Sequence, residues 1–353
     1  MKKLRVLHCP LNNANNAWIL SRAERKIGLQ SDLVVFSKGR FFSDYDQLIT
    51  IDSVSIPNEI KRIKFLFEAI KKYDIFHFNF GQSIWDHPFP SLNHLDLPIL
   101  KKAGKKVIFT YQGDDARQKD IFREKYGRSA YGDGKYSIFD AFLDYNKRLR
   151  IKKITKYADA IFAHNPDIMH VLPPKTRFLP YPNVDIDKIK PAKNRPSKTV
   201  KIIHAPTDRA VKGTEVVVSI IKKLATKYPL ELILVENMSH EAAAMIYKRA
   251  DIAIDQLKIG WYGGFAVEMM ARGVPVISYL RASDMEKFVP FWREIPIVNA
   301  DRNSLEEALM VLIKNSSLRD KIGKKSRQFV EKYHDPLKIA RKTKKTYEDL
   351  CAA

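Results

Sequence analysis

The residues best suited to do chemistry lie in a short segment of the second half of the chain. The run GWYGGFAVEMMARGVPV, residues 260–276, is mostly apolar, yet it places glycines ahead of a single carboxylate, Glu268. Glycines at a helix start let the backbone approach a ligand, and free amides there attract an anion. We expect a phosphate beside Gly263, Gly264 and Phe265, and sugar hydroxyls hydrogen-bonded to Glu268. The alternative, a Glu268 merely exposed on a short helix, is disfavoured by its apolar neighbours.

A second phosphate signal precedes this segment, at residues 204–215, HAPTDRAVKGTE. Arg209 and Lys212 fall in a loop that follows an expected strand and runs into a helix at Gly213 and Thr214. Two cations beside a helix start stabilise a departing diphosphate in the transition state. A basic pair in one loop is a weak signal by itself, but together the two segments predict a diphosphate site.

The elements that must position these residues alternate along the chain. Short apolar runs rich in β-branched residues, apolar on both faces, alternate with amphipathic helical stretches. This pattern predicts an α/β fold with parallel sheets covered by helices on both sides. The expected strands lie at residues 4–10, 31–37, 74–80, 105–113, 158–165, 176–182, 199–206, 230–237, 250–257, 274–280 and 296–300. The clearest helices are expected at residues 17–28, 60–73, 140–157 and 213–228.

A polar stretch with two prolines, near Pro191 to Lys198, divides the 353-residue chain. We expect two doubly wound, Rossmann-like domains, residues 1–190 and 191–335, that face each other across a cleft at the carboxyl ends of their strands. The last helix, residues 336–353, has little to pack on in the second domain by sequence order. We therefore expect it to cross back to the first domain.

The second half of the chain, most clearly from Lys201 to Tyr279, resembles the donor-binding half of family 4 glycosyltransferases (glycosyl transferases group 1), which have the GT-B fold. The resemblance implies transfer of a sugar from a nucleoside-diphosphate sugar to a glycan or lipid-linked acceptor, with retention and without a metal or other cofactor. It also implies that residues 1–190 bind the acceptor and residues 191–335 the nucleotide sugar.

Individual positions match the motifs of that family. By this resemblance Arg209 and Lys212 hold the diphosphate, Gly263 supplies backbone amides, and Glu268 binds the ribose. One position departs from the pattern, because Gly260 stands where the family carries a second glutamate that contacts the transferred sugar.

The first half of the chain offers polar residues at the ends of two expected strands. Gln112 stands where many family members have a histidine near the reacting carbon, a second departure that leaves the stereochemistry open. We assign Gln112, Asp115 and Arg117 to the acceptor or sugar side, and Asp114 a catalytic role. His77 is assigned to the same side, although a buried strand histidine is more often structural.

An asparagine-rich loop, NNANN at residues 12–16, follows the first expected strand. Asparagine tolerates left-handed backbone better than most residues, so this loop can take the place of the family's glycine-rich turn. Asn13 is then expected to contact the donor. A helix cap made by an asparagine is an equally good alternative.

Composition restricts the partners and the compartment. The formal net charge of +22 indicates an anionic partner, and basic helical stretches at residues 61–74 and 145–159 point to an anionic membrane surface. Cys9 and Cys351 form no disulfide or metal pattern, and the N-terminus lacks the apolar core of a signal peptide. We expect a cytoplasmic protein, peripheral at the inner face of the membrane, that does not bind nucleic acid.

Two alternative functions and one possible metal motif were also considered for this sequence. A nucleotide-sugar 2-epimerase of the same fold would need acid and base residues that the sequence does not place. A non-catalytic, basic nucleic-acid-binding protein would carry a basic–aromatic motif, and none is visible. Asp185-Ile186-Asp187 has the D-x-D spacing of metal-dependent transferases but precedes the proline stretch, so we expect an interdomain turn and no metal.

Overall fold

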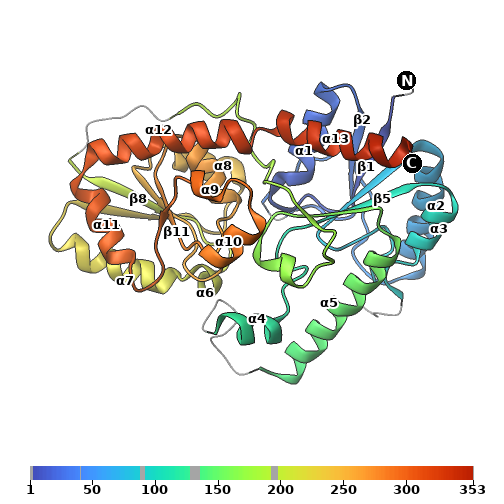
Figure 1. Ribbon diagram of the computed structural model, residues 1–353, viewed down its shortest axis with the longest axis horizontal. Helices are drawn as coiled ribbons and strands as arrows, with labels where there is room; N and C mark the ends of the chain where they lie inside the picture. Colours follow the sequence, from blue (N-terminus) through green and yellow to red (C-terminus); the bar gives the residue numbers. More distant parts are fainter. Residues whose placement is uncertain (1–2, 40, 88–91, 128–135, 192–197, 353) are drawn as a thin grey trace. The chain divides into compact units, whose positions relative to one another are not determined.

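The chain forms two compact units, each with its own parallel sheet (Figure 1). The computed structural model describes residues 3–39, 41–87, 92–127, 136–191 and 198–352. The first unit comprises Met1–Lys125, Lys135–Asn183 and Pro336–Ala353, and the second comprises Tyr126–Gly134 and Val184–Asp335. The division therefore falls after Asn183, somewhat before the expected boundary at 190/191, and the last helix counts with the first unit.

The sheet of the first unit has seven strands in the order β3-β2-β1-β4-β5-β6-β7, with parallel neighbours throughout. Six of them lie where the apolar runs predict strands. The two-residue β3 was missed because it lies in a mixed polar stretch without an apolar run. The strands are β1 (Arg5–Cys9), β2 (Gln30–Val35), β3 (Gln47–Leu48), β4 (Ile75–Asn79), β5 (Lys106–Tyr111), β6 (Ala160–Ala163) and β7 (Arg177–Phe178).

The direction of the connections decides which face each helix covers. The connection from β1 to β2 runs towards one edge of the sheet, whereas those into β4, β5 and β6 run towards the other. Because such connections are right-handed, α2, α3 and α5 cover the face opposite to α1. The helices are α1 (Asn16–Lys26), α2 (Ile56–Lys72), α3 (Asp96–Lys102), α4 (Lys119–Tyr126), α5 (Ile138–Tyr157) and α13 (Pro336–Ala352), with short 3-10 turns at η1 (Asn13–Asn15) and η3 (Asp167–His170).

The C-terminal helix α13 packs beside α1, far from it in sequence (Figure 1). Buried polar contacts fix it there, since the hydroxyls of Thr343 and Tyr347 both donate to Oε1 of Glu24, at 2.9 Å each. Ile339 and Ala340 join the apolar core around β1 and β4. The helix is therefore part of the first unit's core.

The second unit has a five-stranded parallel sheet in the order β12-β11-β10-β8-β9, built around an aliphatic core. All five strands lie where the sequence predicts them. They are β8 (Val200–His204), β9 (Leu230–Leu234), β10 (Ile252–Ile254), β11 (Val276–Ser278) and β12 (Val298–Asn299). The helices are α6 (Arg209–Lys212), α7 (Thr214–Ala225), α8 (His240–Tyr247), α9 (Gly264–Ala271), α10 (Ala282–Phe288), α11 (Leu305–Lys314) and α12 (Ser316–Tyr333), with η4 (Trp292–Glu294).

Among the residues that the structure describes, no helix combines the length and apolar character needed to cross a membrane.

Candidate functional site

The strand order of the second unit points to its binding edge. Moving outward from β8, the chain goes first to β9 on one side and then to β10 on the other, so the order changes direction between β8 and β10. In open parallel sheets a ligand binds at the carboxyl ends of the strands beside such a switch. The segments that follow β8 and β10, which include α6 and the start of α9, carry the predicted residues.

His204, the last residue of β8, fixes the first of these segments. Its Nδ1 donates to the carbonyl of Ile254 at 2.8 Å, so Nε2 accepts from the hydroxyl of Thr214 at 2.9 Å. Burial lowers the pKa of His204 to about 4, which keeps the ring neutral in this arrangement. The contact ties the end of β8 to the start of α7 and to β10.

Lys212 lies at the centre of this edge. Its Nζ donates to Oδ1 of Asp255 at 2.6 Å, and the N–H of Gly263 donates to Oδ2 of the same carboxylate at 2.6 Å. Both charged residues are buried. A Cβ at Gly263 would lie 3.4 Å from Nζ and 3.5 Å from Oδ2, in ordinary van der Waals contact with both groups. Asp255 thus joins the two predicted phosphate-binding loops.

This arrangement corrects two details of the prediction. The amide of Gly263 was expected to be free for an anion, but it already donates to Asp255. Arg209 and Lys212 were expected in a loop, but they are the first and last residues of the short helix α6. Arg209 is exposed, and its guanidinium donates to Glu215 and Glu236 at 2.8–3.0 Å.

Glu268 is buried in the second turn of α9, which excludes the reading of an exposed carboxylate. Its Oε1 accepts from Nη2 of Arg272 and its Oε2 pairs with Nε2 of His240, both at 2.8 Å. Burial favours the protonated acid, but these two partners outweigh it and lower the pKa of Glu268 below its ordinary value. The carboxylate is therefore ionised and held in one orientation.

The start of α9 agrees with the sequence prediction. Gly263 is the N-cap and Gly264 the first helical residue, and the helix ends just before Gly273, whose φ is +72°. Phe265 packs edge-on against Tyr247 of α8, with ring centroids 5.2 Å apart. Its side chain thus helps to fix α9 against α8.

Gly260, where the resembling family has a glutamate, has a specific neighbour in this chain. A Cβ built on Gly260 would lie 2.6 Å from Nη1 of Arg281, whose guanidinium is fixed by Asp284 at 2.9 Å. The backbone φ of Gly260 is +92°, which also disfavours any side chain. An arginine occupies the space that a side chain at position 260 would need.

In the first unit the strand order changes direction between β1 and β4, and the asparagine loop follows β1. Ala14 and Asn15 both have positive φ, at +50° and +61°, as expected for a loop in place of glycines. The side chain of Asn15 makes no capping hydrogen bond to α1, but Oδ1 of Asn12 accepts from the N–H of Trp18 in the first turn of that helix at 3.3 Å. The loop therefore has both the left-handed backbone and an asparagine side chain at the helix start.

Gln112, at the end of β5, meets this loop. Its Oε1 accepts from Nδ2 of Asn13 at 3.1 Å and from Nδ2 of Asn16 at 3.2 Å. Its Nε2 is buried and has no hydrogen-bond partner among the described residues. The structure therefore brings the predicted Asn13 and Gln112 into contact and leaves the amide nitrogen of Gln112 without a partner among the described residues.

The residues after Gln112 form a tight polar turn. The carboxylate of Asp115 accepts from the N–H groups of Gln112 and Gly113 at 2.7–3.1 Å, and burial raises the pKa of Asp115 to about 6. Arg117 is buried, with Nε 2.7 Å from Asp167, while its Nη1 donates at 3.0 Å to the exposed Asp114. Asp114, Asp115 and Arg117 thus lie together with Gln112, as predicted.

His77 does not join them. It is fully buried in the core, where Nδ1 pairs with the Tyr347 hydroxyl and Nε2 with the Thr110 hydroxyl, at 2.6 Å each. Its ligand atom lies within 4.8 Å of those of His8 and Glu24, but the side chains there are already hydrogen-bonded to one another and to α13. The structure assigns His77 to a network that holds the C-terminal helix, and not to an acceptor site.

Sequence reasoning missed the partners of the predicted charges. Asp255 could have been found, because it directly follows β10 and polar residues at carboxyl ends of parallel strands face the binding edge. His240 and Glu236 follow β9 in a polar stretch, and nothing in their spacing signals that they pair with Glu268 and Arg209.

No family model and no curated protein matches this sequence. Solved structures, however, match almost the whole chain. Sucrose-phosphate synthase from Thermosynechococcus elongatus has a TM-score of 0.65 at 16% identity, covering 99% of this chain and 100% of that one. Anabaena HepE in complex with UDP-glucose has a TM-score of 0.65 at 10% identity, with 99% and 100% covered.

A third match is an alpha-glucosyltransferase in complex with UDP and a 13-mer DNA, with a TM-score of 0.60 at 12% identity over 98% of this chain and 100% of that one. At these identities the likeness establishes architecture. The chain has the GT-B fold, with two Rossmann-like α/β units.

Proposed function

We propose that this protein is a glycosyltransferase that moves a sugar from a nucleoside-diphosphate sugar to a glycan or lipid-linked acceptor. The observation that carries the proposal is the edge between β8 and β10, where Lys212, Asp255 and the start of α9 meet beside the buried Glu268. HepE shares the fold and is described in complex with UDP-glucose, which supports the same class of donor here.

In this proposal the diphosphate binds at Lys212 and Arg209. Each cation is held in place by carboxylates, Lys212 by Asp255 and Arg209 by Glu215 and Glu236. A diphosphate would compete with these carboxylates for the same donors, and the amide groups at the start of α9 would add to its binding. Positive charge for the leaving group then comes from the protein, so the proposal includes no metal or cofactor.

Glu268 would bind the ribose. Its carboxylate is ionised and oriented by Arg272, while His240 on its other oxygen is only partly buried. A ribose hydroxyl that reached Oε2 would share that oxygen with His240. Two hydroxyl donors on one carboxylate need an ionised acid, which the lowered pKa of Glu268 supplies.

The first unit would bind the acceptor and part of the sugar through Asn13, Gln112 and the turn at Asp114 and Asp115. The buried Nε2 of Gln112 is a donor suited to a hydroxyl oxygen. Asp114 is exposed and hydrogen-bonded to Arg117, so we assign it the catalytic carboxylate of this unit. Retention of anomeric configuration, family 4 membership and a cytoplasmic location at the inner membrane face complete the proposal, supported by the sequence resemblance and charge.

Calorimetry with UDP, GDP and ADP tests donor binding. We expect one of them to bind the parent protein, and Lys212→Ala to weaken it by about 1–3 kcal/mol, as for other charged hydrogen bonds. Lys222→Ala, an exposed lysine on α7 of the same unit, is the matched control and should bind like the parent. Equal affinity for all three proteins would contradict the assignment.

The ribose role has a test of its own. The parent should prefer the bound ribonucleotide over its 2′-deoxy analogue, and Glu268→Gln should lose that preference because its side chain has only one acceptor oxygen. A variant that melts lower but keeps the full preference would make Glu268 a structural residue.

Product analysis separates the alternatives. A glycosyltransferase releases nucleoside diphosphate only as sugar is transferred or hydrolysed, whereas a 2-epimerase returns an altered nucleotide sugar. A salt-sensitive electrophoretic shift of random DNA, without any nucleotide binding, would instead favour the hypothesis of a non-catalytic nucleic-acid-binding protein.

A further inference from the structure

Two helices of the first unit carry apolar stripes on their outer faces. On α2 the stripe is Ile56, Ile60, Ile63 and Phe67, between 39% and 79% exposed. The spacing of four, three and four residues keeps these side chains on one face of a helix. Large exposed apolar residues are ordinary when scattered singly, but here they recur in register along the first three turns of the helix.

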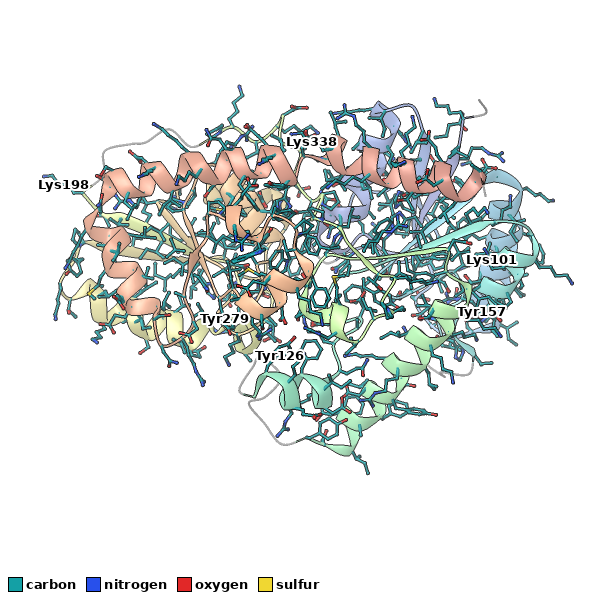
Figure 2. The ribbon with its side chains drawn as sticks, viewed as in Figure 1. Lys101, Tyr126, Tyr157, Lys198, Tyr279 and Lys338 are labelled. Carbon is teal, nitrogen blue, oxygen red and sulfur yellow. The ribbon has the colours of Figure 1, made fainter. Side chains whose placement is uncertain are left out.

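The helix α5 repeats the pattern. Ile138, Phe142 and Tyr145 follow each other at the same helical spacing and are between 53% and 92% exposed, with Phe139 and Leu143 exposed beside them. The opposite side of α5 carries the buried residues Asp144, Ile151 and Ile154. Figure 2 shows side chains projecting outward from this helix, up to the labelled Tyr157 at its end.

Both stripes are bordered by cations. The α2 stripe has exposed Lys64 and Lys71 along its side, and the α5 stripe is continued in the same helical register by exposed Lys152 and Lys156. Over their whole lengths α2 has five basic and two acidic residues, and α5 has six and two. Apolar stripes edged with lysine are the composition of helices that lie in a membrane interface.

The two helices cover the same face of the sheet. The right-handed connections place both on the sheet face opposite to α1 and α13. Both are also fastened to the loop after β4, because Nη1 of Arg62 donates to the carbonyl of Ile84 at 2.7 Å and Arg150 pairs with Asp86 at 2.9 Å. In Figure 1 α5 lies across the sheet from α13.

We infer that this surface docks on an anionic lipid bilayer, with the α2 and α5 stripes inserted among the acyl chains and the bordering lysines at the headgroups. The charge of the chain favours lipid over self-association, because a second copy would bring the same lysines and the same net charge of +22 to the contact. The inference stands on the two stripes and does not depend on the proposed sugar transfer.

Co-sedimentation of the full chain with vesicles tests it. The parent should bind vesicles that contain phosphatidylglycerol and bind pure phosphatidylcholine vesicles much more weakly, with binding reduced by salt. Replacing Ile56, Ile60 and Phe67 with Gln on α2, or Ile138, Phe142 and Tyr145 with Gln on α5, should each weaken binding by about tenfold or more. Glutamine keeps helix propensity, and the positions are exposed, so folding should be retained.

The matched controls are Met245→Gln on α8 and Val311→Gln on α11, exposed apolar residues of the second unit at 63% and 50%. They should bind vesicles like the parent. Insertion is read separately from Phe142→Trp, whose added fluorescence should be quenched by bromine-labelled acyl chains. Equal vesicle binding by parent and stripe variants, failure of the parent to bind, or a parent dimer that the stripe variants dissolve would each overturn the inference.

Discussion

Each unit has a candidate site at the carboxyl ends of its strands, beside the point where the strand order changes direction. The segments that form the two sites are connected by different kinds of contact. In the second unit the loops are joined by charge, with Lys212 and the amide of Gly263 on one buried carboxylate, Asp255. In the first unit the loops are joined by neutral amides, with Asn13 donating to Gln112. The same position in the fold is therefore connected by an ion pair in the second unit and by a hydrogen bond between amides in the first.

The difference matches what each site is proposed to bind. Fixed charges in a poorly solvated place interact strongly with an anionic group and need no rearrangement when it arrives. Amides offer both a donor and an acceptor without net charge, which suits hydroxyl groups of a sugar. An ionic junction is also the more fragile of the two, because removing one partner leaves a buried charge unpaired.

The largest effect should therefore come from Asp255→Ala. The substitution leaves the buried ammonium of Lys212 and the N–H of Gly263 without their acceptor, and we expect it to lower the free energy of unfolding by about 3–5 kcal/mol. Gln112→Ala in the first unit removes only neutral hydrogen bonds and should cost about 1 kcal/mol. Urea unfolding followed by circular dichroism measures both.

A double variant sharpens this test. Asp255→Ala with Lys212→Met removes both charges, and it should regain part of the stability that the single variant loses. If Asp255→Ala were as stable as Gln112→Ala, the contacts of Asp255 with Lys212 and Gly263 would contribute no more to stability than the amide contacts of Gln112. The proposed difference between the two units would then be wrong.

The sequence predicts this fold well because the fold depends on local patterns. Apolar β-branched runs mark eleven of the strands, and the glycines at 263 and 264 mark the start of α9. It also places Asn13, Gln112 and Asp115 together, because each follows a strand of one parallel sheet. Ends of parallel strands meet whatever the sequence separation, so this inference needs only strand assignment.

Pairing between charged side chains is the part that sequence could not supply. Arg209 pairs with Glu236, which follows a different strand, and Glu268 pairs with His240 of another helix. These contacts depend on side-chain reach and local packing, not on periodicity. The prediction for His77 was wrong for the same reason. Its position in a strand does not reveal that it is hydrogen-bonded to Tyr347, which lies far along the chain.

A pair of glycines allows a smaller, matched comparison. Gly113 in the first unit and Gly260 in the second both have positive φ, and a Cβ on either would lie 2.6 Å from Nη1 of an arginine, Arg117 or Arg281. Arg117 is held by hydrogen bonds to Asp167 and Asp114, whereas Arg281 has one hydrogen bond to Asp284 and lies over the ring of Tyr126, with its guanidinium carbon 3.6 Å from the ring centroid.

We expect Gly113→Ala to lower the free energy of unfolding by about 2–3 kcal/mol and Gly260→Ala by about 1–2 kcal/mol, because the positive φ is common to both and Arg281 breaks fewer hydrogen bonds than Arg117 when it makes room for a Cβ. Gly104→Ala is the control, since its φ is +70° with no atom within 4 Å of the added Cβ. Its loss of unfolding free energy measures the cost of the positive φ alone. A larger loss for Gly260→Ala than for Gly113→Ala would contradict the expected order.

The last comparison concerns pH, whose effect on stability has opposite signs in the two units. The folded-state pKa of Asp115 is raised to about 6 by burial, above an unfolded value near 4. Its contribution is therefore fully present below about pH 4 and is lost as pH rises towards 6. Glu268 has a lowered folded-state pKa, so its contribution is present above the unfolded value and is lost as pH falls through the folded one.

Unfolding measured from pH 4 to 7 should separate them. Because of Asp115, whose folded pKa lies about two units above the unfolded value, the parent should lose about 2 kcal/mol of unfolding free energy between pH 4 and 6. Asp115→Asn should not show this loss. Glu268→Gln should lose least relative to the parent at the acid end, because there the Glu268 carboxyl binds a proton more readily in the unfolded chain than in the folded one, where Arg272 and His240 hold it ionised. A stability difference between Asp115→Asn and the parent that stays constant across this range would mean that the Asp115 carboxylate remains ionised, and that the two units respond alike to acid.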